Sequence, residues 1–145
     1  MTIEKQLPLV DEILNEYKPT IGGDFDGYRN HVYRVINLCF SLGQFSDTEK
    51  EKIQIAGCFH DIGIWTASTL AYLPPSESEA SRYLNAKGLG AWDAELTEMI
   101  EKHHGIRSCK DSPFALVEAF RRADIADFSL GMVAMGIPAA FIAQT

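Results

Sequence analysis

An adjacent histidine and aspartate, His60 and Asp61, end a run that has the composition of a buried helix, GCFHDIG at positions 57–63. A buried imidazole beside a buried carboxylate is costly unless the two are paired, hydrogen-bonded or bound to a metal ion. One interpretation is that the helix ends there and both side chains reach water. The other is that both reach a metal ion.

The remaining histidines and one aspartate lie on apolar faces of predicted helices. His31 shares a stripe with Val35, Leu38 and Leu42, whereas His103 lies at the centre of an apolar stripe and His104 lies about 100° further round the helix. Asp124 also lies on an apolar face. Each alone has a simpler explanation, such as a hydrogen-bonded core histidine, the polar end of a helix, or an ion pair of Asp124 with Arg121 or Arg122. Together, on four separate helices, they predict one shared divalent cation.

The predicted ligands are imidazoles and carboxylates without thiolates. This donor set suits Mn, Fe, Co, Ni or Zn and argues against a structural zinc site built from cysteines. Cys39, Cys58 and Cys109 are far apart in the sequence and form no CxxC pair, so we expect reduced thiols. The sequence therefore predicts one divalent transition metal without choosing its identity.

The ordered set of His31, His60, Asp61 and Asp124 resembles the H…HD…D signature of the HD-domain superfamily of metal-dependent phosphohydrolases. The resemblance covers about residues 28–128. It implies an all-α fold, with these four residues as the ligands of one metal. It also implies hydrolysis of phosphoesters, often in nucleotides.

One departure from the family pattern concerns the number of metal ions. Members with two or three metals usually carry a further histidine between the HD pair and the later HH pair, but no histidine occurs from Asp61 to Lys102. Glu77 could replace it as a carboxylate ligand, although the acidic preference of a helix start explains Glu77 more simply. A mononuclear site is therefore favoured.

The hypothesis assigns roles to several side chains. Asp61 would ligate the metal with one oxygen and orient a water molecule with the other, and His103 or His104 would move the proton, with His103 facing the site more directly. Arg29 and Arg107 are the preferred phosphate-binding candidates, with solvated surface charge as the alternative.

Other readings remain open. One is hydration of a small carbon–nitrogen compound, as in the cyanamide hydratases that resemble the same superfamily, and another is a non-catalytic module that binds metal and nucleotide. A purely structural helical domain would bind no metal. Trp65 and Tyr72 lie where a lid could form after the HD pair, but core packing is favoured for them.

Composition limits the partners. The net charge is 13 − 20 = −7, which gives no general attraction to a nucleic-acid polymer or a membrane. The N-terminal segment lacks the basic start and long apolar core of a signal peptide, so a cytoplasmic location is expected. We expect a small phosphorylated substrate, and homo-oligomerisation stays open.

Hydrophobic periodicity is helical almost throughout, without a convincing strand. We therefore expect residues 1–145 to form one all-α domain, a compact multi-helix bundle. A Gly/Asp loop is expected at 21–27, and the apolar segment 130–143 should pack on the core. Expected helices cover residues 3–17, 28–44, 46–61 with a Ser46–Glu49 capping box, 76–88 with a Ser76–Glu79 cap, 92–104 and 113–129.

Overall fold

A computed structural model describes residues 2–129 of the chain, and these residues form helices, turns and loops without any strand. This confirms the predicted all-α multi-helix bundle. The segment 130–143 lies outside the described residues. The helices are α1 (Pro8–Ile21), α2 (Phe25–Phe40), α3 (Asp47–Phe59), α4 (Gly63–Thr66), α5 (Leu73–Ala86), α6 (Asp93–Lys102) and α7 (Ala115–Phe128), with short 3₁₀ turns η1 (Gly22–Asp24) and η2 (Gly90–Trp92).

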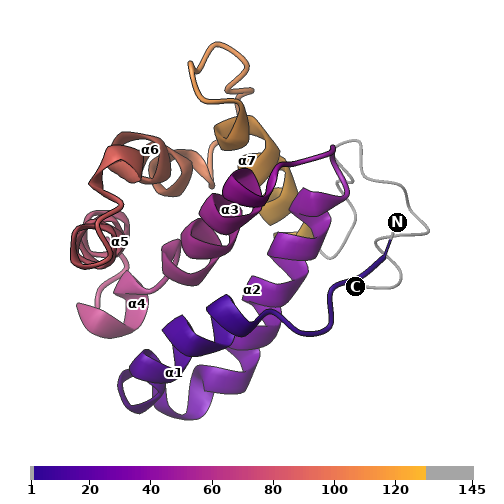
Figure 1. Cartoon of the computed structure of the whole chain (residues 1–145). Helices are drawn as coiled ribbons and strands as arrows, with labels where there is room; N and C mark the ends of the chain where they lie inside the picture. The colour runs from indigo at the N-terminus through magenta and orange to yellow at the C-terminus, as the bar shows by residue number, and fades with distance from the viewer. Residues whose placement is uncertain (1, 130–145) are drawn as a thin grey trace.

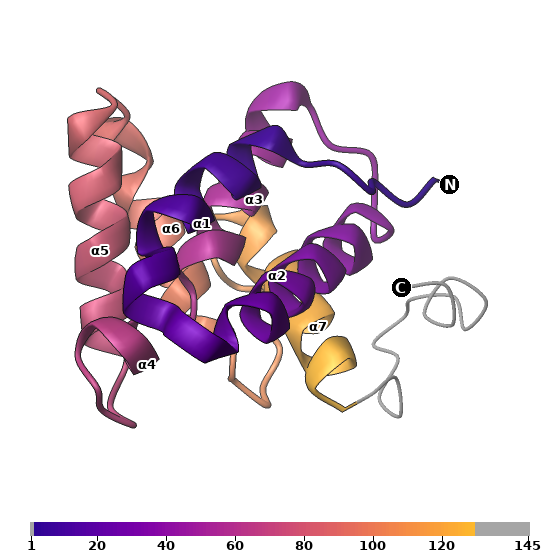
Figure 2. The same ribbon diagram turned by 90° about the horizontal axis from the view of Figure 1, so that it is seen from below.

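Helix α3 runs through the middle of the bundle (Figure 1). Helices α2 and α7 pack together on one side of it, and α5 and α6 pack together on the other. Helix α1 packs on α3, and α6 also contacts α7. The view from below shows α2 and α7 lying along each other (Figure 2). This arrangement brings the end of α3 between α2, α6 and α7.

The start of α3 follows the predicted capping box. The Ser46 hydroxyl accepts a hydrogen bond from the Glu49 backbone N–H at 3.2 Å, and the Glu49 carboxylate accepts one from the Ser46 backbone N–H at 2.8 Å. Two backbone donors that the helix itself leaves unpaired are satisfied in this way. The helix then ends at Phe59, and His60 is its C-cap residue.

The predicted cap at Ser76 is wrong. Helix α5 already begins at Leu73, and Pro74 lies in its first turn, where the missing proline N–H costs nothing. Ser76 is instead fully buried, and its hydroxyl accepts a hydrogen bond from the Gly63 backbone N–H at 2.9 Å. The serine thus joins α5 to the segment that follows the HD pair.

The boundaries of the first two helices also differ from the expectation. Helix α1 begins at Pro8 and continues through Pro19, which lies within its last turn. The expected loop 21–27 is reduced to η1, and α2 begins at Phe25. The η1 turn connects α1 to α2, so Gly22 and Gly23 lie in a short 3₁₀ turn and not in an extended loop.

Gly63→Ala should lower the free energy of unfolding by about 1–3 kcal/mol or more, because the added methyl group overpacks the site. A Cβ atom at Gly63 would lie 2.2 Å from the Tyr72 carbonyl oxygen, so the backbone of α4 or α5 would have to move. Thermal or urea unfolding measures the change. Gly27→Ala is the matched control, because no atom lies within 4 Å of the new methyl and alanine favours the helix. Equal stabilities of the two variants would contradict the prediction.

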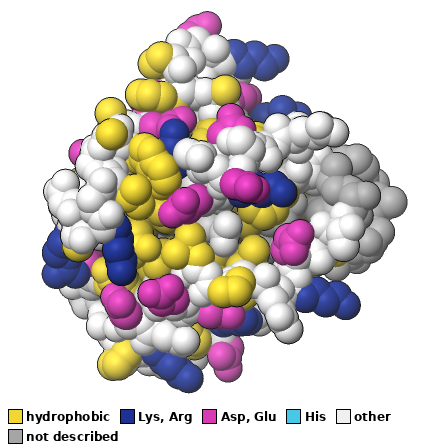
Figure 3. Space-filling model, in the orientation of Figure 1, with side chains coloured by type: hydrophobic (Ala, Val, Ile, Leu, Met, Phe, Trp, Pro, Cys, Tyr) yellow, Lys and Arg dark blue, Asp and Glu magenta, His cyan; other side chains and the backbone are white. Residues whose placement is uncertain are grey.

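The core is continuous across the bundle and includes Cys39 and Cys58 as buried thiols, whose pKa values burial raises far above the usual range. Such thiols stay protonated and unreactive. Acidic and basic side chains are interspersed on the face shown in Figure 3. Among the described residues, no helix has the length and apolar character needed to cross a bilayer.

Candidate metal centre

Four predicted ligands converge where α2, α3 and α7 meet. His31 comes from the middle of α2, His60 and Asp61 follow α3 directly, and Asp124 comes from α7. The Nε2 atoms of His31 and His60 lie 2.9 Å apart. An Asp61 oxygen lies 3.4 Å from His31 Nε2 and 3.2 Å from His60 Nε2. An Asp124 oxygen lies 3.5 and 3.4 Å from the same two nitrogens.

These separations fit a shared metal ion. For bonds of about 2.1 Å, neighbouring ligand atoms lie about 3.0 Å apart at right angles and about 3.4 Å apart at tetrahedral angles. The separations of 2.9–3.5 Å among the four side chains cover this range. His31, His60 and Asp61 could therefore hold a metal ion. Asp124, the fourth predicted ligand, lies beside that group, with one oxygen within 3.5 Å of both imidazole Nε2 atoms.

The two imidazoles present their Nε2 atoms because their Nδ1 atoms are occupied. The His60 Nδ1–H donates to the Gly57 carbonyl oxygen at 2.6 Å. On the other ring, His31 Nδ1 lies 2.6 Å from an Asp127 carboxylate oxygen. Since an acceptor at Nδ1 fixes the proton there, the neutral ring offers a lone pair at Nε2. Both lone pairs then face the same point, as metal-binding histidines require.

Asp124 provides a separate indication of a missing partner. The residue is 1% exposed, and its Oδ2 atom has no hydrogen-bond partner in the described part of the chain. The alternative pairing with Arg121 does not occur, because Arg121 instead binds Glu118 at 2.8 and 2.9 Å. His104 Nδ1 lies 3.7 Å from this oxygen, too far for a hydrogen bond. A buried carboxylate oxygen without a hydrogen bond is costly, and a cation would relieve that cost.

Asp61 faces two groups at once. One of its oxygens lies near His31 and His60, and the other lies 3.1 Å from His103 Nε2. His103 is fully buried, and its Nδ1–H donates to the Ile100 carbonyl oxygen at 2.5 Å. His60 after α3 and His103 after α6 are thus oriented in the same way, because each imidazole donates to the backbone carbonyl three residues earlier.

His104 lies further from the shared ligands than His103 does. Its Nε2 is 3.9 Å from Asp61, its Nδ1 is 3.7 Å from Asp124, and its side chain is 43% exposed. The Tyr72 hydroxyl contacts His104 Nε2. Asp61, His103 and His104 form a second group that could hold a metal ion, with Asp61 common to both groups. The buried His103 lies closer to Asp61, as its position on the helical stripe predicts.

Electrostatics in the centre favour a charged Asp61 carboxylate beside a protonated His60 ring. Burial raises the pKa of Asp61, but His60 and the hydrogen bonds from His103 and His31 lower it far more. Burial lowers the pKa of His60, yet the Asp61 and Asp124 carboxylates raise it well above the ordinary value. A metal ion would replace these ring protons as the partner of the carboxylates, so metal binding should release protons.

Asp127 is a component of the centre that the sequence analysis missed. Its carboxylate binds His31 Nδ1 on one side, and on the other it accepts hydrogen bonds from Arg34 Nε at 2.6 Å and Nη2 at 3.3 Å. Burial raises the pKa of Asp127, but these two partners hold it below its ordinary value. Its position three residues after Asp124, on the same side of α7, was the available signal.

The loop that follows the HH pair is held by a buried ion pair on α7. Arg121 is 2% exposed, and it donates to the Gly105 carbonyl oxygen at 2.9 Å as well as to Glu118. Glu118 in turn accepts the Cys109 backbone N–H at 2.7 Å. Hydrogen bonds from Arg121 lower the pKa of Glu118 to about 2. The loop therefore has a fixed start, which fixes His103 and His104.

Two predicted phosphate contacts lie outside this cluster. Arg29 pairs with Asp11 at 2.8 Å instead of facing the centre, because a residue two positions before His31 points to the far side of the helix. The structure therefore does not bring Arg29 together with the predicted metal ligands, and its contact with a phosphate stays a prediction. Arg107 is exposed on the loop after α6.

The remaining candidates near the HD pair separate into two environments. Trp65 packs on Tyr28 with ring centroids 4.7 Å apart and donates its indole N–H to Asp24 at 3.0 Å, so its main contacts are with other side chains of the fold. Tyr72 lies against His104 at the centre. Glu77 lies on the outer side of α5, where burial and then Glu101 raise its pKa, and it belongs to neither ligand group.

The described residues thus include two His/Asp groups, joined by Asp61, that could hold a metal ion. Comparisons of the chain with protein-family models, with curated proteins and with solved structures found no match.

Proposed function

We propose that this protein is a cytoplasmic metal-dependent phosphohydrolase of the HD-domain type, acting on a nucleotide or another small phosphoester. The observation that carries the proposal is the convergence of His31, His60, Asp61 and Asp124 in the order H…HD…D. A divalent transition metal bound there supplies Lewis-acid polarisation of a phosphoryl oxygen and lowers the pKa of a water molecule.

The residues around the ligands hold and move protons. The hydrogen bond between His103 Nε2 and Asp61 fixes the orientation of that carboxylate toward the other ligands. His104 lies on the open side, where burial and then the neighbouring His103 lower its pKa. A neutral imidazole in that place can accept a hydrogen bond from the Tyr72 hydroxyl, and it can take up a proton near neutral pH and release it to solvent.

Phosphate binding must rely on few cations. Arg107, on the exposed loop after α6, stays the proposed contact with the substrate phosphate. Arg34 reaches the centre only through Asp127, which it holds against His31. A divalent cation would therefore provide most of the attraction for an anionic substrate in a chain of net charge −7.

A second candidate function gains support from the position of Arg29. Because this arginine pairs with Asp11 on the far side of α2, the centre has fewer cations than the sequence suggested. Hydration of a small neutral carbon–nitrogen compound, of the cyanamide hydratase type, needs the same metal chemistry but no phosphate contact. The two functions share the proposed ligands and differ in substrate charge.

A substrate screen with metal-reconstituted protein tests the proposal. Nucleoside monophosphates, cyclic nucleotides and a chromogenic phosphodiester are assayed with Mn, Fe, Co, Ni and Zn in turn, beside cyanamide and nitriles. We expect phosphoester hydrolysis that a chelator abolishes and metal restores, with Asp61→Asn as the inactive control. Turnover of cyanamide or a nitrile alone would establish the hydratase instead. Nucleotide binding without any turnover would indicate a binding module.

A further inference from the structure

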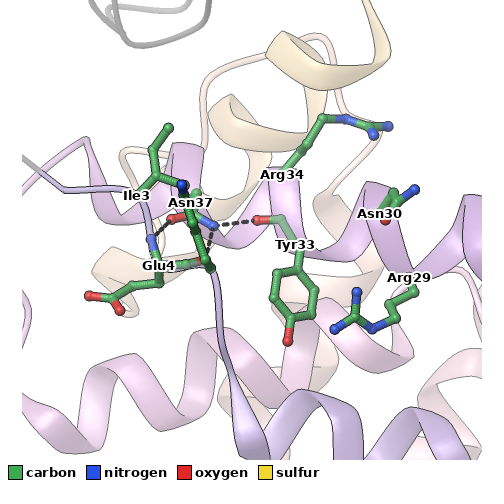
Figure 4. A pocket seen from close by; sticks show the side chains of 8 residues that line it. Ile3, Glu4, Arg29, Asn30, Tyr33, Arg34 and Asn37 are labelled. Carbon is green, nitrogen blue, oxygen red and sulfur yellow. Dashed lines mark hydrogen bonds between the residues drawn. The ribbon is translucent and has the colours of Figure 1, made fainter. Parts of the chain in front are cut away.

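A second concave site lies beside α2, and Figure 4 shows the side chains that line it. It is a pocket of about 410 Å³ between α2 and the segment that precedes α1. Arg29 lies two positions before His31, and Tyr33 lies two positions after it. An offset of two residues corresponds to a rotation of about 200° around the helix, so both side chains point away from the His31 side. The pocket is large enough for a small metabolite and separate from the predicted metal ligands.

The pocket is preformed by hydrogen bonds between its two walls. The Asn37 side chain accepts the Glu4 backbone N–H at 2.7 Å and donates to the Glu4 carbonyl oxygen at 3.1 Å. The Tyr33 hydroxyl accepts the Leu7 backbone N–H at 3.0 Å and donates to an Asp11 carboxylate oxygen at 3.0 Å. A ligand would therefore bind without first having to order these walls.

The lining is cationic although the chain as a whole is acidic. Lys5, Arg29 and Arg34 line the pocket, with Glu4 as the acidic lining residue among the described ones. Asn30 lies between the two arginines in Figure 4. Asp11 and Asp127 balance the charge of the two arginines, but neither lines the pocket, so the side chains that face it present cationic donors in a protein of net charge −7.

Each of the two guanidinium groups is held by an aspartate and keeps further N–H groups that could bind a ligand. Arg29 uses Nε for Asp11 and stacks over the Tyr33 ring at 4.3 Å from its centroid. Arg34 uses Nε and Nη2 for Asp127. Among the described residues, the other N–H groups of these two arginines have no hydrogen-bond partner, and each guanidinium carries five. Their side chains are 34% and 39% exposed, so a ligand can reach them.

We propose that this pocket is an anion site that binds a small molecule through a phosphate group. Oriented arginine forks match phosphate oxygens, and the amide of Asn30 adds a neutral donor between them. The site does not depend on the proposed phosphohydrolase activity, because none of the metal ligands lines it.

Titration calorimetry with inorganic pyrophosphate tests the site in chelator-treated Asp61→Asn protein, so that the metal centre makes no contribution. We expect binding with a dissociation constant of about 1 mM or lower. Adding Asn30→Asp should weaken it roughly tenfold or more, because a carboxylate would repel the phosphate between the two arginines. Asn30 is exposed, so the substitution should leave the fold intact, and circular dichroism verifies this.

A charge-matched pair separates a site from general electrostatics. Lys5→Glu and Lys110→Glu change the net charge equally, but only Lys5 lines the pocket. Lys5→Glu should weaken pyrophosphate binding more than Lys110→Glu does. Absence of binding up to about 5 mM, equal effects of the two lysine variants, or unchanged binding in Asn30→Asp would each overturn the proposal.

Discussion

Metal-reconstituted protein in which His60 and Asp61 are both replaced by alanine should contain no bound metal ion, whereas the unaltered chain should retain about one ion per chain. The substitutions remove two of four converging ligands, and the two that stay, His31 and Asp124, come from different helices. Two ligands hold a transition metal far less tightly than four. Elemental analysis after gel filtration measures the metal content directly.

His60 is fully buried, so its loss also leaves a cavity, and the experiment needs a milder variant. Asp61→Asn keeps the size of the side chain and removes its charge, and it should lower the metal affinity strongly with little loss of helical content. Asp111→Ala is the control, because this exposed carboxylate lies on the loop before α7. Full metal content in the double variant would disprove the assigned ligand set.

The second large effect concerns a residue that would not touch the metal. Asp127→Asn should lower metal affinity about 10–100-fold, the usual effect of losing the carboxylate behind a ligating histidine. The carboxylate lies 2.6 Å from His31 Nδ1 and fixes the ring so that Nε2 faces the other ligands. An amide in its place carries no charge and can present an N–H to that nitrogen. Competition with chelators of graded affinity measures the change.

A double-mutant cycle tests whether Arg34 acts through Asp127. If the guanidinium only holds the carboxylate in place, adding Arg34→Gln to Asp127→Asn should cause no further loss of metal affinity. Arg82→Gln is the matched control, since this exposed arginine pairs with Glu79 on α5. An unchanged metal affinity in Asp127→Asn would remove Asp127 from the centre.

The fold could be predicted from the sequence wherever one local rule was decisive. The helical period gave the all-α class, and the residues of the Ser46–Glu49 box placed the start of α3. The cap at Ser76 failed because two rules competed: the serine pattern marked one start and Pro74 an earlier one. The buried hydroxyl of Ser76 binds Gly63 across the fold, a contact that no local pattern contains.

The candidate site shows the same division. Helical stripes indicated that His31, His103 and Asp124 point inward, and the structure places all three near Asp61 or His60. Nearness to His31 and to a loop favours Arg29 as a phosphate contact, but on a helix an offset of two residues points to the opposite face. Metal ligation and phosphoester hydrolysis stay predictions.

The distance between α2 and α7 along the chain has a consequence for folding order. His31 and Asp127 are 96 positions apart in sequence and meet at 2.6 Å, so their contact closes a loop that includes most of the helices. Non-local contacts of this kind form late, after the entropy of loop closure has been overcome by other packing. During synthesis, α2 can pack on α1 and α3 first, and its contacts with α7 form only after α7 has been made. A zinc finger folds only when its metal binds. In this protein, by contrast, the tertiary structure should form first, because only then do the four predicted ligands lie together.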